Sequence, residues 1–133
     1  MNKMFVIICV LLLGWGLNGC AQSPVASISN APGISNLVIS PTSSTVGAGG
    51  GAITVTAYID FADKDGDLSI LTLKTAAGET KGAITGTDGL KTGTVYSSVM
   101  VSTATSGSFT FEVWVIDKAN NSSNHLSGVF PIL

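Results

Sequence analysis

Two segments of the chain alternate apolar and polar residues with a period of two. Residues 52–62 and 109–116 each place an apolar side chain at every second position. A period of two with β-branched and aromatic residues is typical of half-buried strands, so both segments are predicted to be strands that turn one face to a core. The residues expected on that face are Ile53, Val55, Ala57, Ile59, Phe61, Phe109, Phe111, Val113 and Val115.

Five further segments have weaker strand patterns, and turn-forming residues such as Gly, Asn and Asp separate all of them. The expected strands are residues 35–40, 68–75, 80–87, 91–101 and 126–132. No segment after the N-terminal apolar run has the periodicity of a helix. Seven short strands within about 100 residues predict an all-β fold, a two-sheet antiparallel β-sandwich.

The N-terminus has a different pattern, which is typical of an export signal. Lys3 supplies a short positive end, and residues 4–15 are then almost continuously apolar. At about a dozen residues, this run is too short to span a bilayer as a helix, and it has the length of a signal-peptide core.

Leu17-Asn18-Gly19-Cys20 follows that run and resembles the lipobox of bacterial lipoproteins. The resemblance implies cleavage between Gly19 and Cys20 and acylation of Cys20, for example with palmitate, so that lipid holds the protein at a membrane. Ala21 is not the Asp that often retains lipoproteins at the inner membrane, which implies the outer membrane of a Gram-negative cell; a Gram-positive source would imply the plasma membrane. The alternative is an ordinary secretory signal followed by an incidental cysteine.

These features divide the chain into a signal peptide (1–19), a lipidated cysteine with a flexible tether (20–33) and a β-sandwich (34–133). Removing the signal leaves 114 residues, which is enough for one domain. The mature part has five Lys, no Arg and eight acidic residues, so a nucleic-acid partner is not expected. Cys9 leaves with the signal, so no disulfide is expected either.

Two motifs carry a second resemblance. Asp63-Lys64-Asp65-Gly66-Asp67 follows the first alternating strand, and the second alternating strand runs into Asp117-Lys118-Ala119-Asn120-Asn121. In this arrangement, residues 34–133 are similar to the immunoglobulin-like and cadherin-like domains of bacterial surface proteins, which implies an immunoglobulin-like sandwich. Asn120 stands where those domains often have Gly, and Asn tolerates the left-handed conformation that such a turn requires.

Four of the acidic residues lie within residues 60–67, and carboxylates at alternating positions are the hard oxygen ligands that Ca²⁺ prefers. If the strands alternate in direction, the loops that carry residues 60–67, Asp88 and Asp117 lie at one end of the sandwich. The candidate calcium ligands are Asp60, Asp63, Asp65, Asp67 and Asp117. The spacing does not fit an EF-hand. The alternative is a solvated turn, because Asp and Gly are also good turn residues.

Candidate chemistry elsewhere is sparse. His125 is the only histidine, which is too few for a zinc site, and no G-x-S-x-G motif is present, so an enzyme is not expected. Trp114 and Tyr58 lie on the polar faces of their strands, where exposed aromatic residues can bind a protein or glycan. The alternative for Trp114 is that it covers Ile116 or lies beneath a loop.

The sequence therefore predicts a lipid-anchored, non-enzymatic binding or structural module of the cell envelope, with Ca²⁺ as its one candidate cofactor. Its partners would be the membrane, through the lipid, and an unidentified protein or glycan. The alternative is an accessory subunit or inhibitor of an envelope enzyme or secretion machine, which would act through loops or a free sheet edge.

Overall fold

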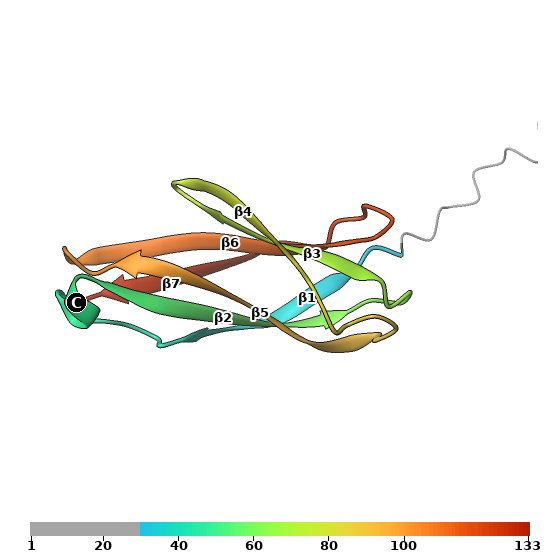
Figure 1. Cartoon of the computed structure of the whole chain (residues 1–133), viewed down its shortest axis with the longest axis horizontal. Coiled ribbons are helices and arrows are strands. Elements are labelled where there is room, and N and C mark those ends of the chain that lie inside the picture. Colours follow the sequence, from blue (N-terminus) through green and yellow to red (C-terminus); the bar gives the residue numbers. More distant parts are fainter. Residues whose placement is uncertain (1–29) are drawn as a thin grey trace, which may run out of the picture.

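Seven strands and one short 3-10 helix make up residues 30–133, the part of the chain that this computed structural model describes (Figure 1). In chain order they are β1 (Gly33–Ser40), η1 (Ala48–Gly50), β2 (Ala52–Ala62), β3 (Leu68–Thr75), β4 (Gly78–Ala83), β5 (Thr92–Ser102), β6 (Gly107–Asp117) and β7 (Leu126–Ile132). The predicted signal peptide, Cys20 and most of the tether lie outside these residues.

The strands form two antiparallel sheets, with the orders β1-β2-β5 and β4-β3-β6-β7. The two sheets pack face to face, which confirms the predicted seven-stranded β-sandwich (Figure 1). In the constant-type immunoglobulin sandwich the fourth strand joins the sheet of the first, second and fifth strands. Here β4 pairs with β3 in the other sheet instead, which leaves one edge of β5 without a neighbouring strand.

Most strand boundaries agree with the sequence pattern, and the fourth strand is the exception. The prediction of a strand over residues 80–87 is wrong, because β4 starts at Gly78 and ends at Ala83. The chain turns at Ala76 and Ala77, earlier than expected. After β4 it has to cross from one sheet to the other before β5 begins, so residues 84–91 cannot stay in the ladder.

The core lies between the sheets and contains the side chains that the alternating patterns placed there. Ile59, Val113 and Val115 are fully buried, and Val55, Ala57, Phe61 and Phe111 are almost so. The opposite faces of β2 and β6 turn away from the core. The alternation of Cβ directions along each strand accounts for this division.

The two long sides of the sandwich differ. On the β1/β7 side, the Asn124 amide accepts from the Ile34 N–H (2.8 Å) and donates to the Ile34 carbonyl (3.0 Å). On the same side, Ser44 N–H donates to the Pro131 carbonyl (3.0 Å), and Ser44 accepts from Leu133 N–H (2.8 Å). These bonds tie the edges of the two sheets together. On the β4/β5 side, the crossover of residues 84–91 runs from one sheet to the other (Figure 1).

Within residues 30–133, no helix has both the length and the apolar character needed to cross a membrane.

Candidate functional site

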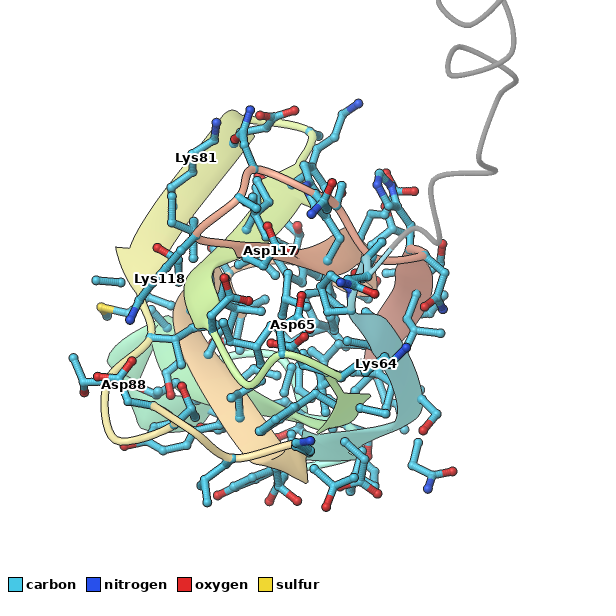
Figure 2. The ribbon with its side chains drawn as sticks, turned by 90° about the vertical axis from the view of Figure 1, so that its right-hand side faces the viewer. Lys64, Asp65, Lys81, Asp88, Asp117 and Lys118 are labelled. Atoms are coloured by element: carbon cyan, nitrogen blue, oxygen red, sulfur yellow. The ribbon has the colours of Figure 1, made fainter. Side chains whose placement is uncertain are left out.

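The loops that carry most of the acidic residues meet at one end of the sandwich, as the sequence predicted. Gly89 N–H donates to the Gly66 carbonyl (2.8 Å), and Lys118 N–H donates to the Asp67 carbonyl (3.0 Å). Figure 2 looks onto this end, where the Lys118 ammonium forms an exposed ion pair with Asp88 (2.7 Å). We call this end the acidic end and define it by Asp63, Asp65, Asp67, Asp88 and Asp117 with their loops.

Gly66 is the residue that allows two of these loops to approach. Its φ of 69° is left-handed, and a Cβ at this position would lie 2.8 Å from the carbonyl carbon of Gly89. Both the backbone conformation and the close approach therefore require glycine here. The glycine of the D-x-D-G-D motif is thus required by the conformation of its turn and by the close approach of the neighbouring loop.

Asp63 and Asp117 are the two buried carboxylates of the acidic end, 1% and 3% exposed. Asp63 accepts from the N–H groups of Asp65 (3.3 Å) and Asp67 (2.8 Å), which is the side-chain capping typical of Asx turns. Asp117 accepts from both the N–H and the side-chain amide of Asn121, at 2.7 Å each. Asn120 in the same turn has a φ of 69°, so the expectation that Asn would replace Gly in a left-handed position is confirmed. Both carboxylates thus organise turns.

Asp60 lies apart from the acidic end, on the outer face of the β1-β2-β5 sheet. It accepts from the Thr94 hydroxyl (2.6 Å) and the Asn36 amide (3.0 Å). These hydrogen bonds, that from Thr94 first, hold the pKa of Asp60 below its usual value. Asp60 is thus held by hydrogen bonds on the sheet face, and its role as a calcium ligand stays a prediction.

Asp67 is the carboxylate at the acidic end that has a buried oxygen without a hydrogen-bond donor. Its Oδ1 is buried and accepts no hydrogen bond. Removal from water raises the pKa of Asp67, and the negative charges of Asp117, Asp63 and Asp65 raise it further, while Lys118 opposes them. Among residues 30–133, no group of three or more His, Cys, Asp or Glu side chains is arranged to hold a metal ion. Calcium binding by Asp63, Asp65, Asp67 and Asp117 stays a prediction.

Asp67→Asn is expected to raise the melting temperature of residues 30–133 at neutral pH. The raised pKa means that the folded protein binds the Asp67 proton more tightly than the unfolded chain does. Stability therefore falls as pH rises through the range from the usual pKa of Asp to the raised pKa, and the ionised group is unfavourable above that range. Thermal unfolding should show the gain at pH 7 and lose it below the usual pKa of Asp. A gain that is independent of pH contradicts this account.

The same variant tests the calcium prediction. If Ca²⁺ neutralises the acidic end, millimolar CaCl₂ should raise the melting temperature of the wild type above its value in EDTA, because a ligand of the folded state stabilises it. Asp67→Asn, which removes the carboxylate with the free oxygen, should abolish that difference. Equal melting temperatures of the wild type in both solutions contradict calcium binding.

Trp114 lies on the outer face of β6, as predicted, and it is only 8% exposed. The His125 ring stacks on it with a centroid distance of 4.3 Å and an interplanar angle of 6°. His125 Nδ1 in turn lies 3.0 Å from Glu112 Oε1. Trp114 is therefore covered by a residue of the loop between β6 and β7, which confirms the alternative that it lies beneath a loop. Its proposed role as an exposed binding residue is wrong.

Tyr58 is the other aromatic residue predicted to be exposed, and it is 42% exposed on the outer face of the β1-β2-β5 sheet. Its cross-strand neighbour is Tyr96, with ring centroids 6.0 Å apart and the rings tilted by 42°. Tyr58 thus remains accessible, beside a second tyrosine that the sequence reasoning did not single out.

A hollow lies on the open β4/β5 side, between the edges of the two sheets. It has a volume of about 460 Å³. Its apolar wall consists of Phe61, Leu71, Ile84, Leu90, Val95 and Tyr96. Hydroxyl groups at its border come from Thr80, Thr85, Thr87, Thr94 and Ser97. We call this hollow the edge cleft.

The edge cleft exists because the inward positions of β4 are small. Thr80 and Gly82 pair with Leu73 and Leu71, whose side chains point into the sandwich, so Thr80 and Gly82 face inward too. A Cβ on Gly82 would have no atom within 4 Å. The space that larger side chains fill in the other strands thus stays empty here. This cleft was not predicted from the sequence, although small residues at alternate positions of a predicted strand are the signal that points to it.

The edge cleft is uncharged, and its lining combines apolar side chains with hydroxyl groups. None of the described residues that line it is a Lys, Arg, His, Asp or Glu. A volume of a few hundred Å³ with apolar walls and a few hydroxyl groups is typical of small-molecule sites. The cleft suits an uncharged ligand with an apolar body, and it contains no group that would neutralise a charged one.

The fold and the cleft together define an antiparallel β-sandwich with an apolar hollow between two sheet edges. No protein-family model matches this chain, and no curated protein matches it. Among solved structures, the chain is similar to the crystal structure of a Niemann-Pick type C2 protein from Japanese carpenter ant, with 11% sequence identity and a TM-score of 0.45. The alignment covers 77% of this chain and 93% of that chain. This degree of likeness carries no conclusion about what the chain binds.

Proposed function

We propose that this chain is a non-enzymatic binding module that takes a small, uncharged, apolar molecule into the edge cleft. A lipid on Cys20 would hold it at a membrane of the bacterial cell envelope, most naturally the outer membrane. The observation that carries the proposal is the cleft of about 460 Å³ with apolar walls and no charged residue. The lipobox-like Leu17-Asn18-Gly19-Cys20 supports the anchoring.

The asymmetry of the sandwich supports a ligand site on the β4/β5 side. Side-chain and backbone hydrogen bonds join the sheet edges on the β1/β7 side, whereas the β4/β5 side has a gap whose wall includes the exposed side chains of Leu90 and Tyr96. Leaving apolar surface in contact with water costs about 25 cal/mol per Å². A ligand that covers this wall would recover that free energy, so the cleft favours apolar molecules over polar ones.

Gly82→Phe is expected to block the cleft without disturbing the fold. The new side chain points inward, and a Cβ at Gly82 meets no other atom. The measurement is fluorescence titration of residues 30–133, which contain all seven strands, with the uncharged apolar dye N-phenyl-1-naphthylamine. We expect saturable enhancement with the wild type and an affinity lower by about tenfold or more in the variant.

Lys81→Phe is the matched control, because position 81 lies next to Gly82 on β4 but faces the other side of the sheet. It adds the same aromatic ring outside the cleft and should leave dye binding unchanged. If the wild type shows no saturable binding, or if both variants lose binding equally, the edge cleft is not a ligand site.

Cys20→Ser tests the anchoring independently of the cleft. We expect the full wild-type chain to incorporate labelled palmitate in a bacterial host. It should also sediment with membranes, because several acyl chains on one cysteine anchor a protein stably. The Cys20→Ser chain should incorporate no label and leave the membrane fraction. Cys9→Ser, within the predicted signal peptide, should behave like the wild type. Labelling that persists in Cys20→Ser contradicts the lipoprotein assignment.

A further inference from the structure

The outer edge of β5 is a row of backbone groups without a neighbouring strand. Thr103 N–H donates to the Gly51 carbonyl, and Asp63 N–H donates to the Lys91 carbonyl. These two hydrogen bonds continue the β2–β5 pairing, in the same register, beyond both of its ends. Backbone groups in an antiparallel pair alternate in direction along each strand. The odd-numbered residues of β5 therefore face β2. The even-numbered ones, namely Thr92, Thr94, Tyr96, Ser98, Met100 and Ser102, turn their N–H and C=O groups to the open side.

This edge lacks most of the features by which proteins usually prevent edge-to-edge pairing. Such features are charged side chains, proline, short strands or a covering element. β5 has 11 residues, none of them charged and none of them proline. By contrast, the edge strand β4 of the other sheet has 6 residues and carries Glu79 and Lys81. β5 is thus open to pairing along the part that the crossover leaves uncovered.

We propose that the β5 edge pairs with the β5 edge of a second copy of this chain, antiparallel and about a two-fold axis at Ser98. An antiparallel pair of identical edges is self-complementary, because each outward N–H meets an outward carbonyl of the same row. The two three-stranded sheets then become one continuous six-stranded sheet. This inference goes beyond ligand binding in the edge cleft and does not depend on it.

The side chains of β5 fit this self-pairing. With the axis at Ser98, Tyr96 of one copy lies opposite Met100 of the other, and the contact occurs twice. Both side chains are largely exposed in the single chain, at 68% and 72%. Sulfur–aromatic contacts between them are favourable, and cross-strand pairs on one face are the units that stabilise a sheet. Because β5 carries no charge, two copies bring no like charges together along the edge.

Cross-linking of the full chain in the membranes of the producing cells tests the pairing. Ser98→Cys places two thiols on the axis, where Cα atoms of a hydrogen-bonded pair lie about 5.5 Å apart, within disulfide range. Under oxidation we expect a reducible band at twice the chain mass. Thr54→Cys is the control, because it lies on the same outer face but on the central strand β2, where it pairs with Met100 of its own chain. Thr54→Cys and the parent chain, which contains Cys9 and Cys20, should give only background.

Charge substitutions then test the register. In the Ser98→Cys background, Tyr96→Lys with Met100→Lys places two like-charged pairs opposite each other and should reduce the cross-linked dimer about tenfold. Tyr96→Lys with Met100→Glu makes the same two pairs attractive and should restore it. Both positions are exposed, so folding is not at issue. Equal cross-linking in the two double variants, cross-linking no stronger than for Thr54→Cys, or a Ser98→Cys adduct with a different protein overturns the proposal.

Discussion

Substituting Gly128 with Ala is expected to destabilise the sandwich by about 3 kcal/mol, because its place is already filled by an aromatic ring. Gly128 lies on β7, directly across from Phe111 on β6. A Cβ at Gly128 would lie 2.7 Å and 2.8 Å from the Phe111 ring atoms Cε1 and Cε2, and closer still to Cζ. Phe111 is 5% exposed and has Phe109 beside it, with ring centroids 5.9 Å apart, so the ring has little room to move.

A double variant distinguishes this clash from a general intolerance of β7. Phe111→Leu alone should cost about 1–2 kcal/mol through lost core packing. Combined with Gly128→Ala, it should cost less than the sum of the two single effects by about 1 kcal/mol or more, because the shorter side chain vacates the space that the new methyl needs. Denaturant unfolding of residues 30–133 gives all three values. Strict additivity would show that Phe111 is not the obstacle.

Two other glycines provide an internal scale for the same measurement. Gly93 on β5 lies opposite Phe61 on β2, and its Cβ would meet the Phe61 ring at 2.9 Å and 3.1 Å. Because that ring borders the edge cleft, it can move aside, and Gly93→Ala should cost less than Gly128→Ala. Gly82→Ala meets no atom and should be close to neutral or stabilising. The expected order of destabilisation is therefore Gly128, then Gly93, then Gly82.

The sequence was sufficient to predict the strands whose two faces differ most. The apolar alternation in β2 and β6 predicted which side chains face the core, and Ile59 and Val113 are indeed fully buried. β4 was misplaced because its outward residues Glu79 and Lys81 alternate with the small Thr80 and Gly82, so it has no apolar face to detect. Its position follows from pairing with β3, and pairing between strands is not visible in local periodicity.

The candidate site shows the same limit. The expected alternation of strand directions correctly placed the loops after β2 and β6 at one end of the fold. It did not reveal that the backbone register places Asp60 on an outer face with Thr94, or that Asp63 and Asp117 are occupied by turn N–H groups. The edge cleft escaped notice for a related reason: a cavity consists of missing side chains on neighbouring strands, and its walls are known only once the strand order is known.

Asp117→Ala is expected to cost about 3 kcal/mol, because the variant removes a charged acceptor that makes two short hydrogen bonds in a buried position. The carboxylate is 3% exposed and accepts from the Asn121 N–H and from the Asn121 side-chain amide, at 2.7 Å each. Asp117→Asn should be nearly as costly, because its amide would direct a donor at one of these two donors. Unfolding should be measured in EDTA, so that any loss reflects the turn and not a metal ion.

Asn121→Ala supplies the matched partner for a double-mutant cycle. It keeps the backbone N–H but leaves Asp117 Oδ2 without the Asn121 amide, at an expected cost of about 2 kcal/mol. The double variant with Asp117→Ala should be less destabilised than the sum, since either substitution alone already breaks that contact. If Asp117→Ala has no effect in EDTA and is costly only in CaCl₂, the carboxylate acts as a calcium ligand and the turn does not depend on it. A loss of the same size in both solutions assigns Asp117 to the turn, which is the result that its two bonds to Asn121 lead us to expect.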